Sequence, residues 1–285
     1  MFLFIVIMPG VGRICLSQHK MRLRADALLG VTGGNMDNKE ERAEEFYNSF
    51  LTYTESLFYG LAAGNELDFQ SIQKMIKMTC EFVQMDRNSI VCVMQTAGQY
   101  ENPHVSHSVR SCIIAIIIGI YLKLPENQLI ELGVAGLLCN IGVLNLSERI
   151  YTSGPDLLKS GTDMEKKLLY FHPIYAHSIL RSFKFPLSIC EAVLQHHELE
   201  DGSGYPKQLK GKKIGLYGKI LVVAGFYEAF LMERTKRGYG EILQILKNGG
   251  SFDVSVIQAL VNSIFIYPAG IYVLLSNGNY GQADK

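Results

Sequence analysis

Residues 196–206 read His-His-Glu-Leu-Glu-Asp-Gly-Ser-Gly-Tyr-Pro, and they separate a helical pattern from an irregular loop. The two imidazoles end an apolar helix predicted over 186–197, and the glycines and the proline that follow predict turns. A helix end that opens onto a glycine-rich loop is a common place for a binding site. Adjacent imidazoles can ligate a metal or form a polar cluster with water, and spacing alone does not distinguish these.

Outward from this stretch, apolar residues recur at helical spacing on both sides. The segment 104–122 is so rich in isoleucine that we expect it to be buried on most sides. Asp68 is the expected N-cap of the second helix. Helices are predicted over 37–60, 68–83, 104–122, 125–139, 163–183, 186–197, 215–234, 239–248 and 253–264, with a further short apolar stretch over 89–96.

The C-terminal end has a different pattern. Residues 272–280 read as two short strands around the turn Asn277-Gly278, a dipeptide that favours tight hairpins. The sequence therefore predicts an all-α fold, a multi-helix bundle with N-terminal helices and a small C-terminal β-hairpin from about residue 267.

Three parts are expected along the chain: residues 1–35, an N-terminal helical region over 36–98, and a main domain over 99–285. The apolar run 2–8 is far shorter than the roughly 20 residues that span a bilayer, and it has no basic segment before it, so we expect no transmembrane segment and no signal peptide there. Residues 1–35 are interpreted either as a poorly structured or mis-assigned extension, with Met36 as the true start, or as an amphipathic membrane-surface anchor.

The composition limits the classes of function. The 285 residues carry no formal net charge, so nothing in the sequence indicates a DNA or RNA duplex as partner. The six cysteines are scattered without a CxxC pair, which favours free thiols in a reducing, cytoplasmic compartment.

Seven histidines are present, and five lie in or beside apolar helices. A single histidine on such a helix is more often a core or surface residue than a ligand. Five together favour a site, because buried imidazoles need partners and a bound cation supplies one. They are His104, His107, His172, His196 and His197.

The order and spacing of His107-Ser108, His172-Pro173, His196-His197 and Gly204-Tyr205-Pro206 resemble the HD-GYP family over roughly residues 55–285. Members of that family hydrolyse cyclic di-GMP or related cyclic dinucleotides with two or three metal ions, which generate hydroxide and neutralise the phosphate. The resemblance implies that the metal ligands are His107, His172, His196 and His197. It also implies that the substrate-binding residues are Gly204, Tyr205, Pro206, Arg234 and Arg237.

The sequence departs from the family at several catalytic positions. Cys139-Asn140 stands where the family has its His-Asp pair, Val143 where it has a lysine, Gly225 where it has a later aspartate, and Pro103 where some members have a glutamate. A carboxamide carries no charge and bridges two cations poorly, although Cys139 as a thiolate could ligate a soft metal. We therefore expect the metal at His107 to be lost. One divalent metal (Fe, Mn or Zn) is expected at His172, His196 and His197.

These losses favour a degenerate HD-GYP protein of bacterial second-messenger signalling. Such a protein would act by binding cyclic di-GMP or a partner with a GGDEF (diguanylate cyclase) domain. The alternative is an active metal-dependent phosphodiesterase that is slow or mononuclear. A third interpretation is a purely structural helical domain that holds neither metal nor ligand.

Overall fold

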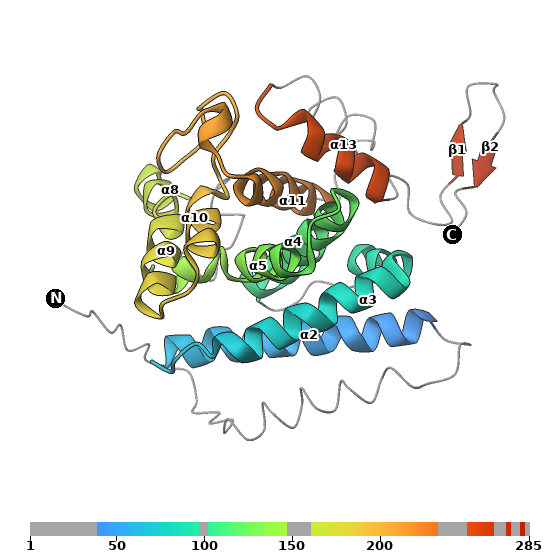
Figure 1. Ribbon diagram of the computed structural model, residues 1–285, viewed down its shortest axis with the longest axis horizontal. Helices are drawn as coiled ribbons and strands as arrows, with labels where there is room; N and C mark the ends of the chain where they lie inside the picture. Colours follow the sequence, from blue (N-terminus) through green and yellow to red (C-terminus); the bar gives the residue numbers. More distant parts are fainter. Residues whose placement is uncertain are drawn as a thin grey trace.

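The computed structural model describes residues 39–96, 102–146, 161–232, 250–264, 272–274 and 280–282. These residues form a helical bundle with two short strands (Figure 1). The all-α fold class predicted from the periodicity is confirmed. The predicted extension 1–35, the helix expected over 239–248 and the boundary at residues 98 and 99 lie outside the described residues.

The N-terminal region is a pair of long helices, α2 (Lys39–Ala62) and α3 (Phe69–Thr96). Asp68 Oδ1 accepts hydrogen bonds from the backbone N–H groups of Gln70 and Ser71 at 3.1 and 3.3 Å, so the predicted N-cap is confirmed. The separate stretch expected over 89–96 is part of α3. It follows a kink at Asp86 (φ −147°, ψ 66°), whose carboxylate accepts from the Ser89 hydroxyl at 2.9 Å and from the Ser89 backbone.

The centre of the bundle is α4 (Pro103–Tyr121), which starts at an N-cap formed by Asn102. It packs against α5 (Glu126–Leu138) and α11 (Leu216–Met232), and it also contacts α2, α3 and α13 (Val254–Ser263) (Figure 1). The expectation that this segment is buried on most sides is confirmed, because Ile113, Ile114, Ile116, Ile117 and Ile118 are all in the core.

Two segments are long and apolar enough to cross a membrane, Pro103–Tyr121 and Glu126–Asn145. Inside this fold, 83% and 72% of their apolar windows are buried against other parts of the protein. The core helices of a globular bundle have the same composition, so these two segments are weak evidence for a membrane span.

On the other side of α5 and α11 lies a layer of short helices: η2 (Ile141–Asn145), α8 (Asp163–Leu169), α9 (His172–Ser182), α10 (Leu187–Gln195) and η4 (Gly211–Lys213) (Figure 1). The single helix expected over 163–183 is wrong, because the chain turns at Tyr170 and Phe171. Pro173 follows two residues after Phe171, and a proline has no N–H to continue the hydrogen bonds of α8.

Strands β1 (Tyr272–Leu274) and β2 (Tyr280–Gln282) pair antiparallel, with Val273 opposite Gly281. Residues 275–279, which hold the expected Asn-Gly turn, lie outside the described residues, so the hairpin stays a prediction.

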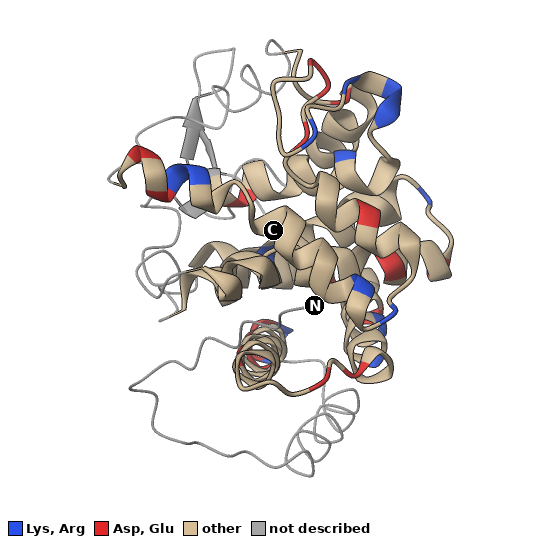
Figure 2. Cartoon of the chain, turned by 90° about the vertical axis from the view of Figure 1, so that its left-hand side faces the viewer, with Lys and Arg blue, Asp and Glu red and all other residues tan. Residues whose placement is uncertain are grey.

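Acidic and basic side chains are interspersed along the described elements (Figure 2), in keeping with a formal net charge of zero. The five cysteines in the described residues, all but Cys15, are free thiols.

Candidate metal and phosphate site

Three of the predicted histidines come together where two helices end. His172 begins α9, and His196 and His197 follow the last turn of α10. One potential ligand atom from each lies within 4.8 Å of those of the other two. The contact between α9 and α10 thus joins residues that are more than twenty positions apart in the sequence.

Hydrogen bonds to the backbone fix the orientation of two of these rings. His172 Nδ1 lies 2.7 Å from the carbonyl oxygen of Leu169, and His196 Nδ1 lies 2.6 Å from that of Val193. Because a carbonyl oxygen can only accept, each Nδ1 must carry the hydrogen, and each Nε2 of the neutral ring then has a free lone pair.

Those two Nε2 atoms face each other at 3.0 Å. Two lone pairs at this distance repel each other unless a proton or a cation lies between or beside them. Three imidazoles are a common ligand set for one Zn²⁺ or Fe²⁺ with an open coordination position. The donor atoms therefore fit a single divalent metal, which His172, His196 and His197 would hold.

Burial keeps this cluster uncharged. Desolvation lowers the pKa of all three rings below the ordinary histidine value, to about 4 for His196 and well below 6.5 for His172 and His197. For His172 and His197 the neighbouring imidazoles lower the pKa further, since a second positive charge in the cluster is unfavourable. Neutral imidazole is the form that binds metal, so the fold presents the ligands in their binding state.

The loop after His197 is held against the cluster by close backbone packing. A Cβ atom on Gly204 would lie 2.4 Å from the backbone nitrogen of Leu199 and 2.5 Å from the carbonyl oxygen of His197, so only glycine fits. The next residue, Tyr205, donates its N–H to that same carbonyl at 3.1 Å. Its ring stacks on His197, with centroids 4.6 Å apart and planes 20° apart.

Two further residues set the position of the cluster. Glu198 is fully buried, and its carboxylate accepts from the backbone N–H groups of Lys207 and Leu209 at 2.6 and 2.7 Å, which closes the loop. A Cβ on Gly142 would lie 1.9 Å from the carbonyl oxygen of His172, so glycine allows η2 to contact the start of α9.

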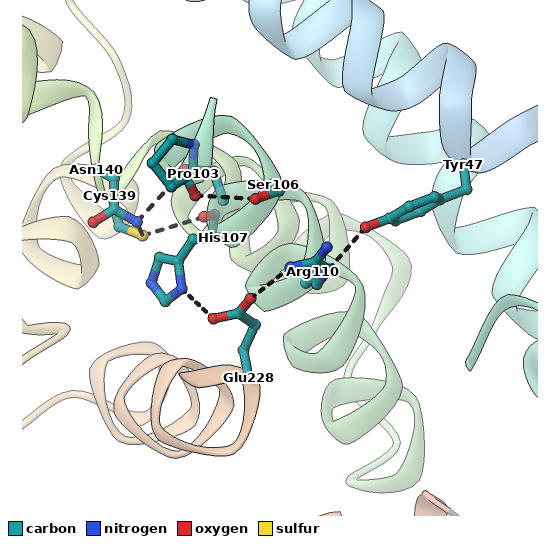
Figure 3. A network of polar contacts seen from close by, with 10 residues as sticks. Tyr47, Pro103, Ser106, His107, Arg110, Cys139, Asn140 and Glu228 are labelled. Atoms are coloured by element: carbon teal, nitrogen blue, oxygen red, sulfur yellow. Dashed lines mark hydrogen bonds and ion pairs between the residues drawn. The ribbon is translucent and has the colours of Figure 1, made fainter. Parts of the chain in front are cut away.

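His107 lies on α4 and has a different set of partners (Figure 3). Its Nδ1 hydrogen-bonds with Oε2 of Glu228, a buried carboxylate on α11, whose Oε1 lies 3.3 Å from Nη1 of Arg110. Arg110 Nε in turn donates to the hydroxyl of Tyr47 on α2 at 2.9 Å. We call Tyr47, His107, Arg110 and Glu228 the Glu228 network.

Charge is balanced inside the Glu228 network. Burial alone would lower the pKa of His107, but the charge of Glu228 and its hydrogen bond outweigh burial and raise it. Burial alone would raise the pKa of Glu228, and His107 and Arg110 together lower it below the ordinary value. The carboxylate is thus ionised, with His107 and Arg110 both as charge partners.

The positions that depart from the family pattern offer His107 no ligand. A Cβ on Gly225 would lie 3.9 Å from His107 Cε1, the place where a longer side chain would face the ring. Cys139 donates its thiol to the carbonyl oxygen of Gly136 at 3.2 Å, and burial raises the pKa of that thiol to about 12, so it is not a thiolate here. Val143 packs in a small apolar cluster with Leu146 and Leu169.

Asn140 is also turned toward its neighbours, since its Nδ2 lies 3.3 Å from Cys139 Sγ and 3.5 Å from the hydroxyl of Ser108 (Figure 3). His104, one turn before His107, is buried on the same helix. Pro103 is the first residue of α4.

The structure brings His172, His196, His197, Gly204 and Tyr205 together, as the sequence predicted, with Pro206 next in the same loop. His107 lies apart from the three-histidine group, in the Glu228 network. Arg234 and Arg237, the predicted phosphate contacts, lie outside the described residues. Sequence reasoning missed Glu198 and Glu228. The available signal was the position of each acidic residue: Glu198 directly follows His196-His197, and Glu228 lies one helical turn after Gly225 in an apolar segment.

With this geometry established, similarity to known proteins identifies the class. The HD domain family matches residues 91–256, which is more than half of the chain. The chain therefore belongs to the HD domain family.

Individual relatives refine that class. The cyclic di-GMP phosphodiesterase PA4108 of Pseudomonas aeruginosa is 29% identical over 231 residues, 79% of this chain and 55% of that protein. The 3'3'-cGAMP-specific phosphodiesterase 3 of Vibrio cholerae is 27% identical over 157 residues, 54% of this chain and 33% of that protein. The chain spans about half the length of PA4108 and of a second curated relative that it matches.

A solved structure agrees on the fold. Bd1817, an HDG"Y"P protein from Bdellovibrio bacteriovorus, superimposes with a TM-score of 0.67 over 86% of this chain and 78% of that one, at 16% sequence identity. At this identity the likeness establishes the fold alone. Together with the phosphodiesterase relatives, it confirms the HD-GYP resemblance read from the histidines and the Gly-Tyr-Pro loop.

Proposed function

We propose that this protein binds a cyclic dinucleotide, cyclic di-GMP or a related molecule, at one divalent metal held by His172, His196 and His197, and that it acts by binding this ligand without hydrolysing it. The observation that carries the proposal is the pair of Nε2 lone pairs facing at 3.0 Å beside His197. A divalent cation bound there supplies positive charge for a phosphate oxygen.

The chain's own residues support binding more than hydrolysis. Positions 139, 140 and 225 provide no carboxylate near His107, and the carboxylate that does lie there, Glu228, is already engaged by Arg110. A second cation would have to compete with this guanidinium for the same negative charge. Hydrolysis of a phosphodiester relies on charge placed to match the transition state, and removing it costs orders of magnitude in rate.

The loop residues are suited to hold the ligand beside the metal. Tyr205 is half-buried, and burial raises the pKa of its phenol, so the hydroxyl remains a neutral hydrogen-bond donor. Gly204 and Glu198 fix the loop in place, which reduces the entropy that binding must remove.

The test measures metal content and cyclic di-GMP binding in wild type and two histidine variants. Wild-type protein purified without chelator should contain about one equivalent of divalent metal and should bind cyclic di-GMP in calorimetry. His196→Ala should lose both, whereas His177→Ala, a histidine outside the cluster that faces Glu191 at 3.6 Å, should keep both. Metal-loaded wild type that binds no cyclic dinucleotide would refute the proposal.

The same samples address the alternative of an active enzyme. If wild type and His196→Ala form equal, negligible product from cyclic di-GMP, the protein acts by binding. Product well above the His196→Ala level would favour the slow or mononuclear phosphodiesterase. The observation that favours this alternative is Glu228, which returns one carboxylate to the neighbourhood of His107.

We also propose that a GGDEF-domain protein docks on the 199–210 loop, since Asp201 and Ser203 are exposed there beside the conformationally fixed Gly204. A purified diguanylate cyclase domain should be retained by the wild-type chain and lost on Asp201→Arg. Equal retention by both would reject this docking site.

A further inference from the structure

Tyr170 is an exposed aromatic residue at the edge of the metal and phosphate site. It lies at the corner between α8 and α9, two residues before His172. Its ring contacts Tyr205, with centroids 4.5 Å apart and planes 40° apart. Tyr205 is itself stacked on His197 at 4.6 Å, so three rings lead from the histidine cluster to the surface.

The outer end of this series is open. Tyr170 is 43% exposed and Phe171 is 48% exposed. Of the ten large apolar side chains that are exposed in the described residues, four lie within residues 164–174, the other two being Met164 and Ile174. Exposed aromatic area beside a polar site is typical of a binding surface.

We propose that Tyr170 is a stacking residue for a nucleobase of the cyclic dinucleotide. This inference rests on the proposed function and adds a contact to the base, whereas the histidine cluster addresses the phosphate. A purine has two flat π-faces, and base–aromatic stacking is a recurrent way to hold nucleotides. A base stacked on Tyr170 would extend the ring series that begins at His197.

The corner that carries Tyr170 is well fixed, which favours a preformed contact. The N–H of Tyr170 donates to the carbonyl of Lys166 at 3.2 Å, and the N–H of Phe171 donates to that of Leu168 at 3.0 Å. At its other end, α8 has a capping box, in which Thr162 and Glu165 exchange hydrogen bonds. A ring held in this way loses little freedom when a base stacks on it.

The charges around the corner suit the same ligand. Lys166 and Lys167 occupy the last turn of α8, and Lys166 is one helical turn before Tyr170. Residues four apart share a helix face, so a cation lies on the same side as the exposed ring. Asp163 and Glu165, the acidic residues of α8, lie in its first turn, so the lysines are at the end nearest Tyr170. A dianionic dinucleotide would meet positive charge at that end and flat apolar area at Tyr170.

The first measurement is the affinity of the full chain, loaded with metal, for cyclic di-GMP. Tyr170→Ala should weaken binding by roughly 5- to 150-fold, the range found when a stacking aromatic is removed. Tyr170→Phe keeps the ring and should stay within about twofold of wild type. Tyr121→Ala is the matched control, because Tyr121 is 45% exposed at the end of α4, away from the site.

The second measurement uses the absence of tryptophan from the sequence. Tyr170→Trp introduces a single tryptophan, which can be excited at wavelengths where tyrosine does not absorb. Its emission should be quenched by cyclic di-GMP but not by inorganic phosphate, which has no base. Tyr121→Trp should show no quenching with either. This readout reports contact at residue 170 and does not depend on whether the alanine variant keeps the loop in place.

The outcomes separate this inference from the proposed function. If wild type binds cyclic di-GMP and Tyr170→Ala binds equally well, the stacking role of Tyr170 is refuted, and the proposed metal site is unaffected. The same conclusion follows if Tyr170→Trp is not quenched at saturation. If wild type does not bind, the proposed function fails and the base contact fails with it.

Discussion

The imidazoles of His107 and of the three-histidine cluster have different partners, and their pKa values are shifted in opposite directions. His172 and His196 turn lone pairs toward each other beside His197, and burial lowers the pKa values of all three. His107 instead faces Glu228, which raises its pKa, and Arg110 balances the carboxylate. The first group needs a proton or a cation between or beside its lone pairs, whereas the second is paired with the chain's own carboxylate and guanidinium.

This difference teaches that histidines of one sequence motif can have unlike surroundings in the fold. When the family motif is read from the sequence alone, all four matching histidines are equivalent metal ligands. The structure shows that their partners decide what each can do. A ring already paired with a carboxylate and a ring whose Nε2 faces another imidazole have different chemistry available.

The largest expected effect comes from breaking the Glu228 network. Glu228→Ala leaves Arg110 buried without its carboxylate, and removing one partner of a buried ion pair costs about 3–5 kcal/mol of unfolding free energy. Chemical denaturation measures this directly. Glu191→Ala, where the carboxylate is 41% exposed, should cost under about 1 kcal/mol. Equal losses for the two variants would contradict a buried network.

The next effect is the acid response of the three-histidine cluster. Its folded pKa values lie below the unfolded value of 6.5, so its stability is complete above about pH 6.5 and is lost as pH falls toward about 4. For His196 alone the shift corresponds to roughly 3 kcal/mol. Unfolding with a chelator present, measured across this window, should show the loss.

The comparison variant for the acid response is His196→Ala, which should lose less stability than wild type over the same pH range. His107 behaves in the opposite sense, because its raised pKa gives stability that is present at low pH and lost as pH rises through the folded value. Identical slopes for wild type and His196→Ala would show that the cluster does not stay neutral in the fold.

A smaller loss of unfolding free energy is expected at Gly204, where the loop after His197 packs against the three-histidine cluster. Gly204→Ala places a Cβ within 2.4 Å of backbone, and the required shift should cost about 1–3 kcal/mol and displace Tyr205. Gly60→Ala, whose Cβ would meet a side chain at 3.4 Å inside α2, should cost nothing. Thermal unfolding of both variants tests this, and a Gly204→Ala protein as stable as wild type would be inconsistent with the packing.

The smallest expected effect is the effect of Cys139 on the amount of bound metal. Cys139→Ser should leave the amount of bound divalent metal unchanged, because the thiol donates to a carbonyl and stays protonated. Elemental analysis beside His196→Ala measures this. Substantial loss of metal in Cys139→Ser would show that Cys139 helps to hold the metal that His196 binds.

Much of the fold could be predicted from the sequence, because helical periodicity and caps are local. The isoleucine-rich α4 and the cap at Asp68 are examples. The break between α8 and α9 was missed since the apolar pattern continues across Tyr170 and Phe171, and only Pro173 indicates the turn. The kink at Asp86 likewise depends on a side-chain contact with Ser89.

The site could be predicted only in part. The three-histidine cluster followed from residue order and family spacing. Glu228 and Arg110 could not be assigned, because their pairing joins positions 118 residues apart on helices that meet only in the folded bundle. The orientation of His172 and His196 also depends on backbone carbonyls that carry no sequence signal.

The contact between Tyr47 and Arg110 has a consequence for how the protein folds. The family match begins at residue 91, yet the hydroxyl that accepts from Arg110 belongs to α2, and Phe46 and Phe50 share one core with α4. The packed core is therefore larger than the segment that the family matches. A chain that began at residue 91 would lose the outer end of the Glu228 network together with a wall of its core, because Tyr47 joins α2 to His107 through Arg110 and Glu228.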